Sequence, residues 1–125
     1  MAAPNLVGIT TIVGVTTYLN LSTTDATLLV SNPSASNNVY KINSLIVANI
    51  DGSSSADITV KLHDAAAGLG VSYSIANTVA VAADSTLVVL DRASAIYLEE
   101  NKSISVTASA ANDLSVICSY ETITD

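Results

Sequence analysis

The last third of the chain alternates short apolar runs with polar or charged residues, a pattern that predicts β-strands. Four such runs follow one another before Glu121: Thr86–Leu90, Ala95–Leu98, Ser103–Ala108 and Leu114–Tyr120. In the last two runs every second position is apolar, which is typical of antiparallel strands with one buried face. We therefore expect four short strands in this stretch.

Similar patterns occupy the rest of the chain. Ile58, Val60 and Leu62 alternate with polar residues and predict a strand with one buried face. Five further β-prone stretches are Gly8–Ser22, Ala26–Val30, Val39–Ile50, Val71–Ile75 and Thr78–Ala82. In the long stretch Val39–Ile50, one predicted face holds Tyr40, Ile42, Ile46 and Ile50. The turn at Asp51-Gly52 predicts a hairpin to the next strand, and residues 64–70 are expected to form a loop.

The number and spacing of these runs predict an all-β fold. About eight to ten short strands with a turn roughly every 8 to 12 residues indicate an antiparallel β-sandwich, jelly-roll-like and without a long helix. A weak internal repeat agrees with two similar halves: Asp25-Ala-Thr-Leu-Leu-Val resembles Asp84-Ser-Thr-Leu-Val-Val, and Asp57-Ile-Thr-Val resembles Asp113-Leu-Ser-Val. A chain of 125 residues is long enough for one such domain, which we place at residues 25–125.

Residues 1–24 differ from the rest because they contain no charged side chain, and Asp25 is the first. One interpretation is that they form the ordinary first strands of the sandwich. The other is an extended arm that completes its hydrogen bonds on another subunit, since an uncharged β-prone edge is a template for strand pairing. The arm hypothesis predicts an interface made by Ile9, Thr11, Ile12, Val13, Val15, Tyr18 and Leu19.

The charge balance excludes several classes of partner. The formal net charge is −7, and the only cationic side chains, Lys41, Lys61, Arg92 and Lys102, are widely spaced. Nucleic acids and anionic membrane surfaces require clustered Lys and Arg, so we expect neither as a partner. The apolar runs are too short for a membrane span.

Residues able to perform chemistry are few. His63 is the only histidine and is predicted to be exposed, whereas Cys118, the only cysteine, is predicted to be a small buried core residue. One of each does not make a typical zinc site. Asp51, Asp57 and Asp64 lack the spacing of a calcium loop. We therefore expect a protein that is not an enzyme, with no catalytic, cofactor-binding or metal-binding residue.

Five stretches resemble small virion structural proteins of tailed phages, particularly phages of marine bacteria and cyanobacteria. They are MAAPN at the start, KINSLIVANIDG (Lys41–Gly52), ADITVKL (Ala56–Leu62), ADSTLVVLD (Ala83–Asp91) and IYLEENKSISVTASAANDLSVICSYE (Ile96–Glu121). They span most of the chain and occur in order. They are structural patterns rather than catalytic motifs.

The resemblance implies a building block of the virion, assembled in the bacterial host cytoplasm. It favours a capsid decoration, or cement, protein that binds the head lattice through its N-terminal arm. The implied partners are copies of itself, with a trimer favoured, and the major capsid protein or another virion protein. A neck, tail or fibre component is the alternative within this class. A carbohydrate-binding module, which would need exposed aromatics such as Tyr73 or Tyr97, or an adhesion domain is the alternative outside it.

Overall fold

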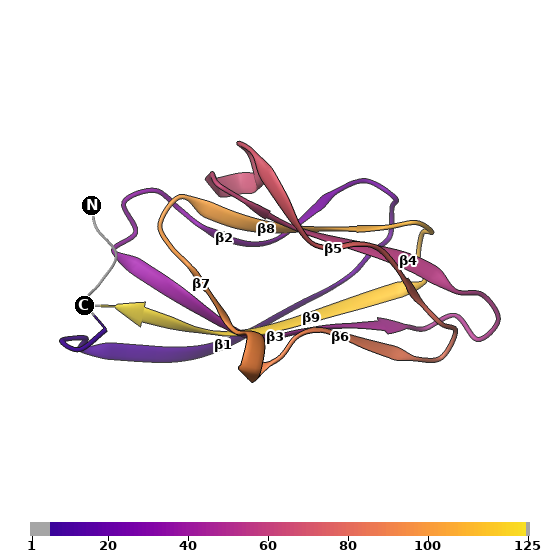
Figure 1. Ribbon diagram of the computed structural model, residues 1–125, viewed down its shortest axis with the longest axis horizontal. Helices are drawn as coiled ribbons and strands as arrows, with labels where there is room; N and C mark the ends of the chain where they lie inside the picture. Colours follow the sequence, from indigo (N-terminus) through magenta and orange to yellow (C-terminus); the bar gives the residue numbers. More distant parts are fainter. Residues whose placement is uncertain (1–5, 125) are drawn as a thin grey trace.

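The computed structural model describes residues 6–124 and consists of two antiparallel β-sheets packed face to face (Figure 1). The strands are β1 (Thr11–Asn20), β2 (Thr27–Asn32), β3 (Asn38–Asn49), β4 (Ala56–His63), β5 (Ser72–Val81), β6 (Thr86–Leu90), β7 (Ile96–Leu98), β8 (Lys102–Ala108) and β9 (Leu114–Thr124). Two 3₁₀ turns, η1 (Ala66–Gly68) and η2 (Arg92–Ser94), are the only helical elements in the described part. The predicted all-β sandwich is confirmed.

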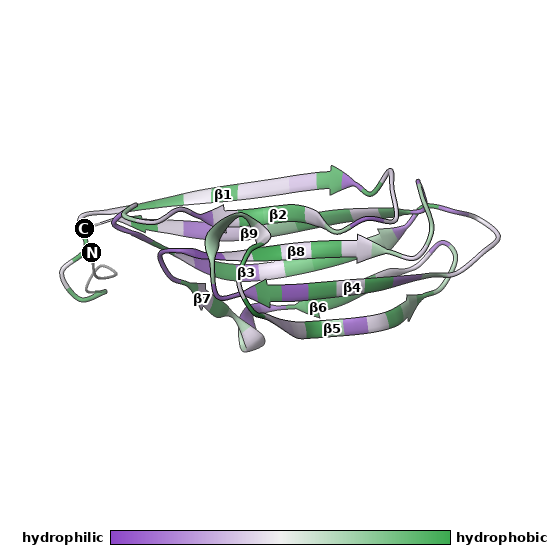
Figure 2. Ribbon diagram, turned by 90° about the horizontal axis from the view of Figure 1, so that it is seen from above, coloured by the Kyte–Doolittle hydropathy of each residue, from purple (hydrophilic) through white to green (hydrophobic). Residues whose placement is uncertain are grey.

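The strand order is that of a jelly roll. Sheet A has the order β1-β9-β3-β6, with β7 also pairing to β3, and sheet B has the order β2-β8-β4-β5. Because β6 and β7 follow one another along β3, they act as one interrupted strand, so each sheet contributes four strands. Apart from the β4–β5 hairpin and the β6–β7 pair, consecutive strands lie in opposite sheets, and Figure 2 shows the two layers from above.

Two predicted connections differ from the structure. The turn at Asp51-Gly52 does not close a hairpin, because it carries the chain from β3 in sheet A to β4 in sheet B. The two strands predicted between residues 71 and 82 form one strand, β5. Its pairing with β4 shifts on both sides of Val60, and the N–H of Thr78 donates to the hydroxyl of Thr59 at 3.0 Å. These irregularities keep Asn77 within the strand despite its turn propensity.

The predicted face of β3 is correct only before Asn43. Ile42 is buried, but the pairing of β3 with β9 skips Asn43, and the next buried position is Leu45. One extra residue moves every later side chain to the opposite face. Ile46 and Ile50, predicted to share the face of Ile42, are therefore turned outward.

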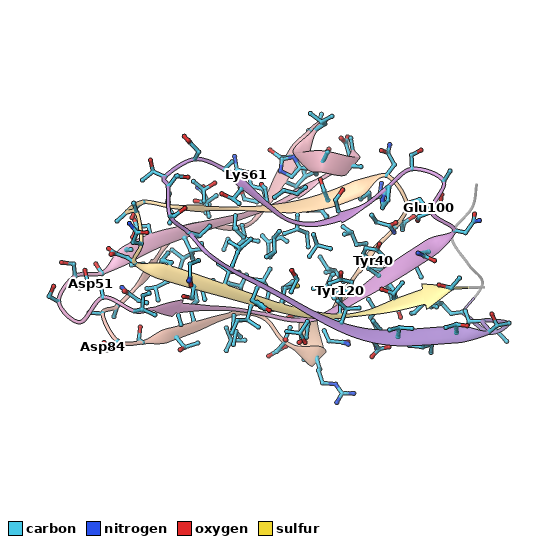
Figure 3. All side chains as sticks on the ribbon, turned by 180° about the vertical axis from the view of Figure 1, so that it is seen from behind. Tyr40, Asp51, Lys61, Asp84, Glu100 and Tyr120 are labelled. Carbon is cyan, nitrogen blue, oxygen red and sulfur yellow. The ribbon has the colours of Figure 1, made fainter. Side chains whose placement is uncertain are left out.

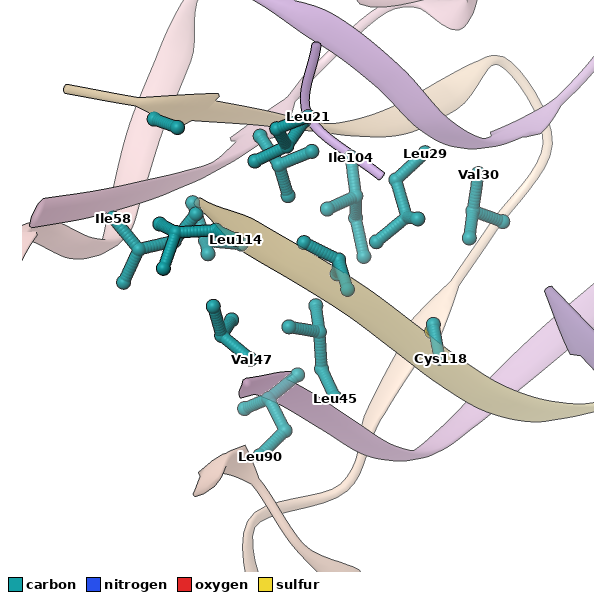
Figure 4. Packing of buried hydrophobic residues seen from close by; sticks show 14 of the residues in the cluster. Leu21, Leu29, Val30, Leu45, Val47, Ile58, Leu90, Ile104, Leu114 and Cys118 are labelled. Atoms are coloured by element: carbon teal, nitrogen blue, oxygen red, sulfur yellow. The ribbon is translucent and has the colours of Figure 1, made fainter. Parts of the chain in front are cut away.

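Aliphatic side chains from both sheets fill the space between the layers (Figure 4). The predicted buried face of β4 is confirmed, since Ile58 and Val60 are fully buried. The prediction for Cys118 is also confirmed, because its side chain lies in the same cluster. The core includes Leu21, Ile42, Leu45, Val47, Leu98, Ile104, Val106, Leu114 and Val116.

Candidate interaction surface

The uncharged N-terminal segment forms β1, an edge strand of sheet A. Its ten residues pair with β9 of the same chain in one unbroken antiparallel register, from Thr11 opposite Thr124 to Asn20 opposite Ser115. The start of the segment, residues 1–5, including the MAAPN stretch of the resemblance, lies outside the described residues. The strand therefore has one edge paired within the chain and one edge open.

The structure brings the predicted interface residues together on β1 and immediately before it. Tyr18 and Ile12 point to the outer face of sheet A and are 68% and 53% exposed. Val13 points to the inner side, yet it is 50% exposed because this end of β1 is little covered by sheet B. The remaining residues are Thr11, which is exposed, and Ile9, Val15 and Leu19, which are half-buried.

The open edge of β1 presents unpaired backbone groups. The N–H of Leu21 donates to the carbonyl of Leu114 at 2.9 Å, which fixes the alternation of the ladder. Every second residue along β1 directs its N–H and C=O away from β9, and these are Ile12, Gly14, Thr16, Tyr18 and Asn20. No other strand within residues 6–124 pairs with this edge.

The other sheet edges are less suited to pairing with a new strand. The pairing of β2 with β8 shifts between Leu28 and Val30, and β5 is irregular next to Val60. The remaining edge consists of β6, with five residues, and β7, with three. Bulges and short strands protect an edge, whereas β1 has no bulge, proline or charge. It is therefore the most accessible template for strand addition.

An apolar row crosses the outer face of sheet A. Tyr18 of β1 pairs with Ile117 of β9, Ile117 pairs with Ile46 of β3, and Ile46 pairs with Val88 of β6. Tyr18, Ile117 and Val88 are exposed, and Ile46 is half-buried. We call these four residues the apolar row. Sequence reasoning missed it because its members come from four strands, although Ile117 on the polar side of β9 was a local signal.

Small polar side chains surround the apolar row. On one side lie Thr16, Ser119 and Ser44, and the hydroxyls of Thr16 and Ser119 are 2.9 Å apart. On the other side, Ser115 donates to the amide oxygen of Asn20. These bonds pair Thr16 with Ser119 and Ser115 with Asn20 within the sheet itself. The centre of the face therefore carries no charged side chain, as is common at the centre of protein–protein contacts.

Acidic residues concentrate instead at one end of the sandwich. The N–H of Asp84 donates to the carbonyl of Asp51 at 3.2 Å, and the carbonyl of Asp113 accepts from the N–H of Ile50 at 2.8 Å. Three neighbouring loops thus carry one carboxylate each, and Figure 3 labels two of these residues, Asp51 and Asp84, at the same end. We call this region the acidic end. No cation pairs with these carboxylates within the described part of the chain.

His63 is not the exposed residue that the sequence predicted. It is half-buried, its Nε2 lies 2.8 Å from the hydroxyl of Ser105, and its Nδ1 is buried without a hydrogen-bond partner. The β4–β5 loop folds back over this end of sheet B. Ser103 holds the loop by donating to the carbonyl of Ala65 and accepting from the N–H of Gly68.

The groups capable of chemistry are dispersed. Burial raises the pKa of the Cys118 thiol to about 12. Among residues 6–124, no three His, Cys, Asp or Glu side chains are placed to hold one metal ion. A hollow of about 270 Å³ lies on β1 and β9, lined by Tyr18, Leu19, Asn20, Ser115, Val116 and Ile117. It is below the size of roughly 300–1,000 Å³ that is usual for small-molecule sites.

Comparison with protein-family models gives no match, and comparison with curated proteins gives none either. In the region that the structure covers, no helix has the length and apolar character needed to cross a membrane.

Proposed function

We propose that this protein is a structural component of a tailed-phage virion, and within that class a capsid decoration protein. The sequence resemblance supports the class. The observation that carries the mode of action is the uncharged surface formed by β1 and the apolar row on a chain of net charge −7. Such a surface binds by contact area and backbone hydrogen bonds, and it requires no catalytic group.

The two sides of the molecule have different physical properties. The acidic end and the charged loops keep the protein soluble and repel other acidic surfaces. The outer face of sheet A lacks this repulsion around the apolar row, so it is the side that approaches a neighbouring protein. The partners are copies of the same chain and the major capsid protein or another virion protein. Assembly takes place in the host cytoplasm, where a single buried Cys118 stays reduced.

The other classes receive less support. A carbohydrate-binding platform needs neighbouring exposed aromatic rings. Tyr73 and Tyr97 are both exposed, but Tyr73 belongs to β5 in sheet B and Tyr97 to β7 in sheet A. We therefore propose no sugar-binding function.

The location of the protein on the particle tests the proposal. Virions of the phage that encodes the chain are purified, the protein is quantified by mass spectrometry, and its density is located by cryo-electron microscopy. We expect many copies on the outer surface of the head. Density at the neck or tail would favour the alternative within the class, and absence from purified virions would contradict the proposal.

Point variants test the surface. Val88→Lys places a charge in the apolar row at a position that is 56% exposed, so the fold should survive while occupancy on the particle falls at least tenfold. Val71→Lys is the matched control, since Val71 is 58% exposed but lies in the β4–β5 loop, outside the apolar row. Equal occupancy of the two variants would exclude the apolar row. A deletion of residues 2–20 is not a suitable test of the surface, because it would also remove β1, the strand that pairs with β9 within the fold.

A further inference from the structure

We propose that the open edge of β1 pairs with the same edge of a second copy, antiparallel and about a two-fold axis at Thr16. Sheet A would then continue through both copies, with the two β1 strands at its centre. Figure 2 shows β1 along one border of the sandwich, where a second copy has access. The inference rests on the proposed function, because it names the partner of one part of that surface.

The ladder geometry limits the possible registers. An antiparallel hydrogen-bonded pair exchanges two bonds, and both residues must direct their backbone groups toward the shared edge. On β1 these are the alternate residues from Ile12 to Asn20. If Thr16 faces Thr16 of the second copy, then Gly14 faces Tyr18 of the second copy, and Ile12 faces its Asn20. The strand is therefore used from end to end.

Side-chain complementarity selects this register. Gly14 leaves its outer face empty, since a Cβ built there would have no atom within 4 Å, while Tyr18 is 68% exposed. An aromatic ring laid over a glycine on the neighbouring strand covers bare backbone and stabilises the pair. Facing threonines are also a favourable cross-strand pair. On the inner side, Val13 would contact Leu19 of the second copy and lose its 50% exposure.

Charge favours a second copy in this orientation. Two chains of net charge −7 repel each other, but β1 itself is uncharged from Thr11 to Asn20. An antiparallel pair directs the acidic end of one copy away from the acidic end of the other. A parallel arrangement of neighbours would bring the acidic ends together and cost electrostatic energy. The two-fold pair is therefore preferred over the threefold ring that the resemblance implies.

Cysteine cross-linking of the full chain tests the register. Facing residues in a hydrogen-bonded pair have Cα atoms about 5.5 Å apart, which suits a disulfide. Under mild oxidation Thr16→Cys should form a covalent dimer. Ile12→Cys and Asn20→Cys should not cross-link alone but should cross-link when mixed. The native Cys118 is buried, so the unmodified protein is the blank. Efficient self-linking by Asn20→Cys but not by Thr16→Cys would overturn the register.

The oligomeric state tests the interface. The unmodified protein should be a dimer by light scattering at high micromolar concentration. Thr16→Lys, which sets two charges together on the axis, should yield a folded monomer with an unchanged circular dichroism spectrum. The control Ala80→Lys, at an exposed position of the β5 edge opposite Asp57, should remain a dimer. A monomeric native protein, or a trimer that Thr16→Lys leaves intact, would refute the pairing. Neither result changes the outcome expected from locating the protein on the particle. The pairing through β1 can therefore be refuted without refuting the proposed function.

Discussion

The thiol of Cys118 is fully buried, and burial raises its pKa from 9.0 to about 12. In the unfolded chain the thiol loses its proton near pH 9, whereas in the folded protein it keeps it. Between pH 9 and 12 the unfolded state therefore binds fewer protons. The free energy of unfolding must fall as the pH rises through this window, by at most about 1.4 kcal/mol per pH unit.

Urea unfolding at a series of pH values above 8 measures this effect. We expect the native protein to lose stability more steeply than Cys118→Ala, in which the titrating group is absent. The alanine variant is less stable at pH 8 because it leaves a small cavity, but its slope with pH is shallower. Burial also raises the pKa of Tyr120, but this residue is present in both proteins, so its contribution largely cancels in the comparison. Parallel slopes would show that Cys118 does not contribute.

The burial of a residue was predictable from the sequence where it depends on the pattern along a single strand. Around Cys118 and Val60 every second residue is apolar, and this alternation alone predicts that both side chains are buried. His63 follows the same pattern but is half-buried, at the end of sheet B where Ser103 bonds to the β4–β5 loop. That contact joins residues from different strands, and no local pattern contains it.

Two buried asparagines join the sheets at opposite ends of the sandwich. Asn32, at the end of β2, donates to the carbonyl of Leu98 in β7. Asn49, at the end of β3, donates to the carbonyls of Ser54 and Val81 at 2.9 Å each. Its side-chain oxygen also accepts from a backbone N–H in the β3–β4 connection. These bonds explain why that connection crosses between sheets instead of closing a hairpin.

We predict that Asn49→Ala lowers the free energy of unfolding by about 3 kcal/mol, because carbonyls near the core lose their donor. Asn43→Ala is the control on the same strand. Its amide donates to the carboxylate of Glu121 on the outer face, so its loss should cost less than about 1 kcal/mol. Urea unfolding measures both variants. Equal losses would mean that Asn49 does not join the sheets.

Strand positions were largely predictable, and strand irregularities were not. Alternation located β4, β6, β8 and β9, since each is a short run bounded by turn residues. The skipped Asn43 in β3 and the shifts opposite β5 depend on the partner strand. A bulge is a property of a pair of strands, so a pattern read along one strand assigns the wrong face beyond it.

At the scale of the whole molecule, the weak sequence repeat coincides with the symmetry of the fold. If β6 and β7 are counted as one strand, the sandwich has eight strands in chain order. Replacing each strand of sheet A by the strand four places further along the chain, and returning to the first strand after the eighth, gives the strand order of sheet B read in reverse. The repeated segments lie at β2 and β6, and at β4 and β9, which are two of the pairs related in this way. The two halves of the sequence therefore occupy equivalent places.

The candidate surface was only partly predictable for the same reason. The lack of charge in residues 1–24 is visible in the sequence and indicated β1. The apolar row is not visible, because Tyr18, Ile117, Ile46 and Val88 become neighbours only when four strands pair in register. The topology is needed to find it.

The acidic end makes the stability of the whole molecule depend on salt. Asp51, Asp84 and Asp113 lie on adjacent loops, and no cationic side chain among residues 6–124 pairs with them, so folding brings like charges together. Salt screens such repulsion over about 10 Å at 0.1 M. We expect the melting temperature to rise with sodium chloride concentration, as measured by differential scanning calorimetry.

Asp84→Asn tests whether this dependence belongs to the acidic end or to net charge alone. Asp84 has φ 58°, which asparagine tolerates well, and the variant should gain on the order of 0.5 kcal/mol at low salt. Its melting temperature should then depend less on salt. Asp91→Asn removes the same charge at η2, away from those loops, and asparagine can still cap the turn. Its salt dependence should match the native protein, so equal slopes for both variants would assign the effect to net charge.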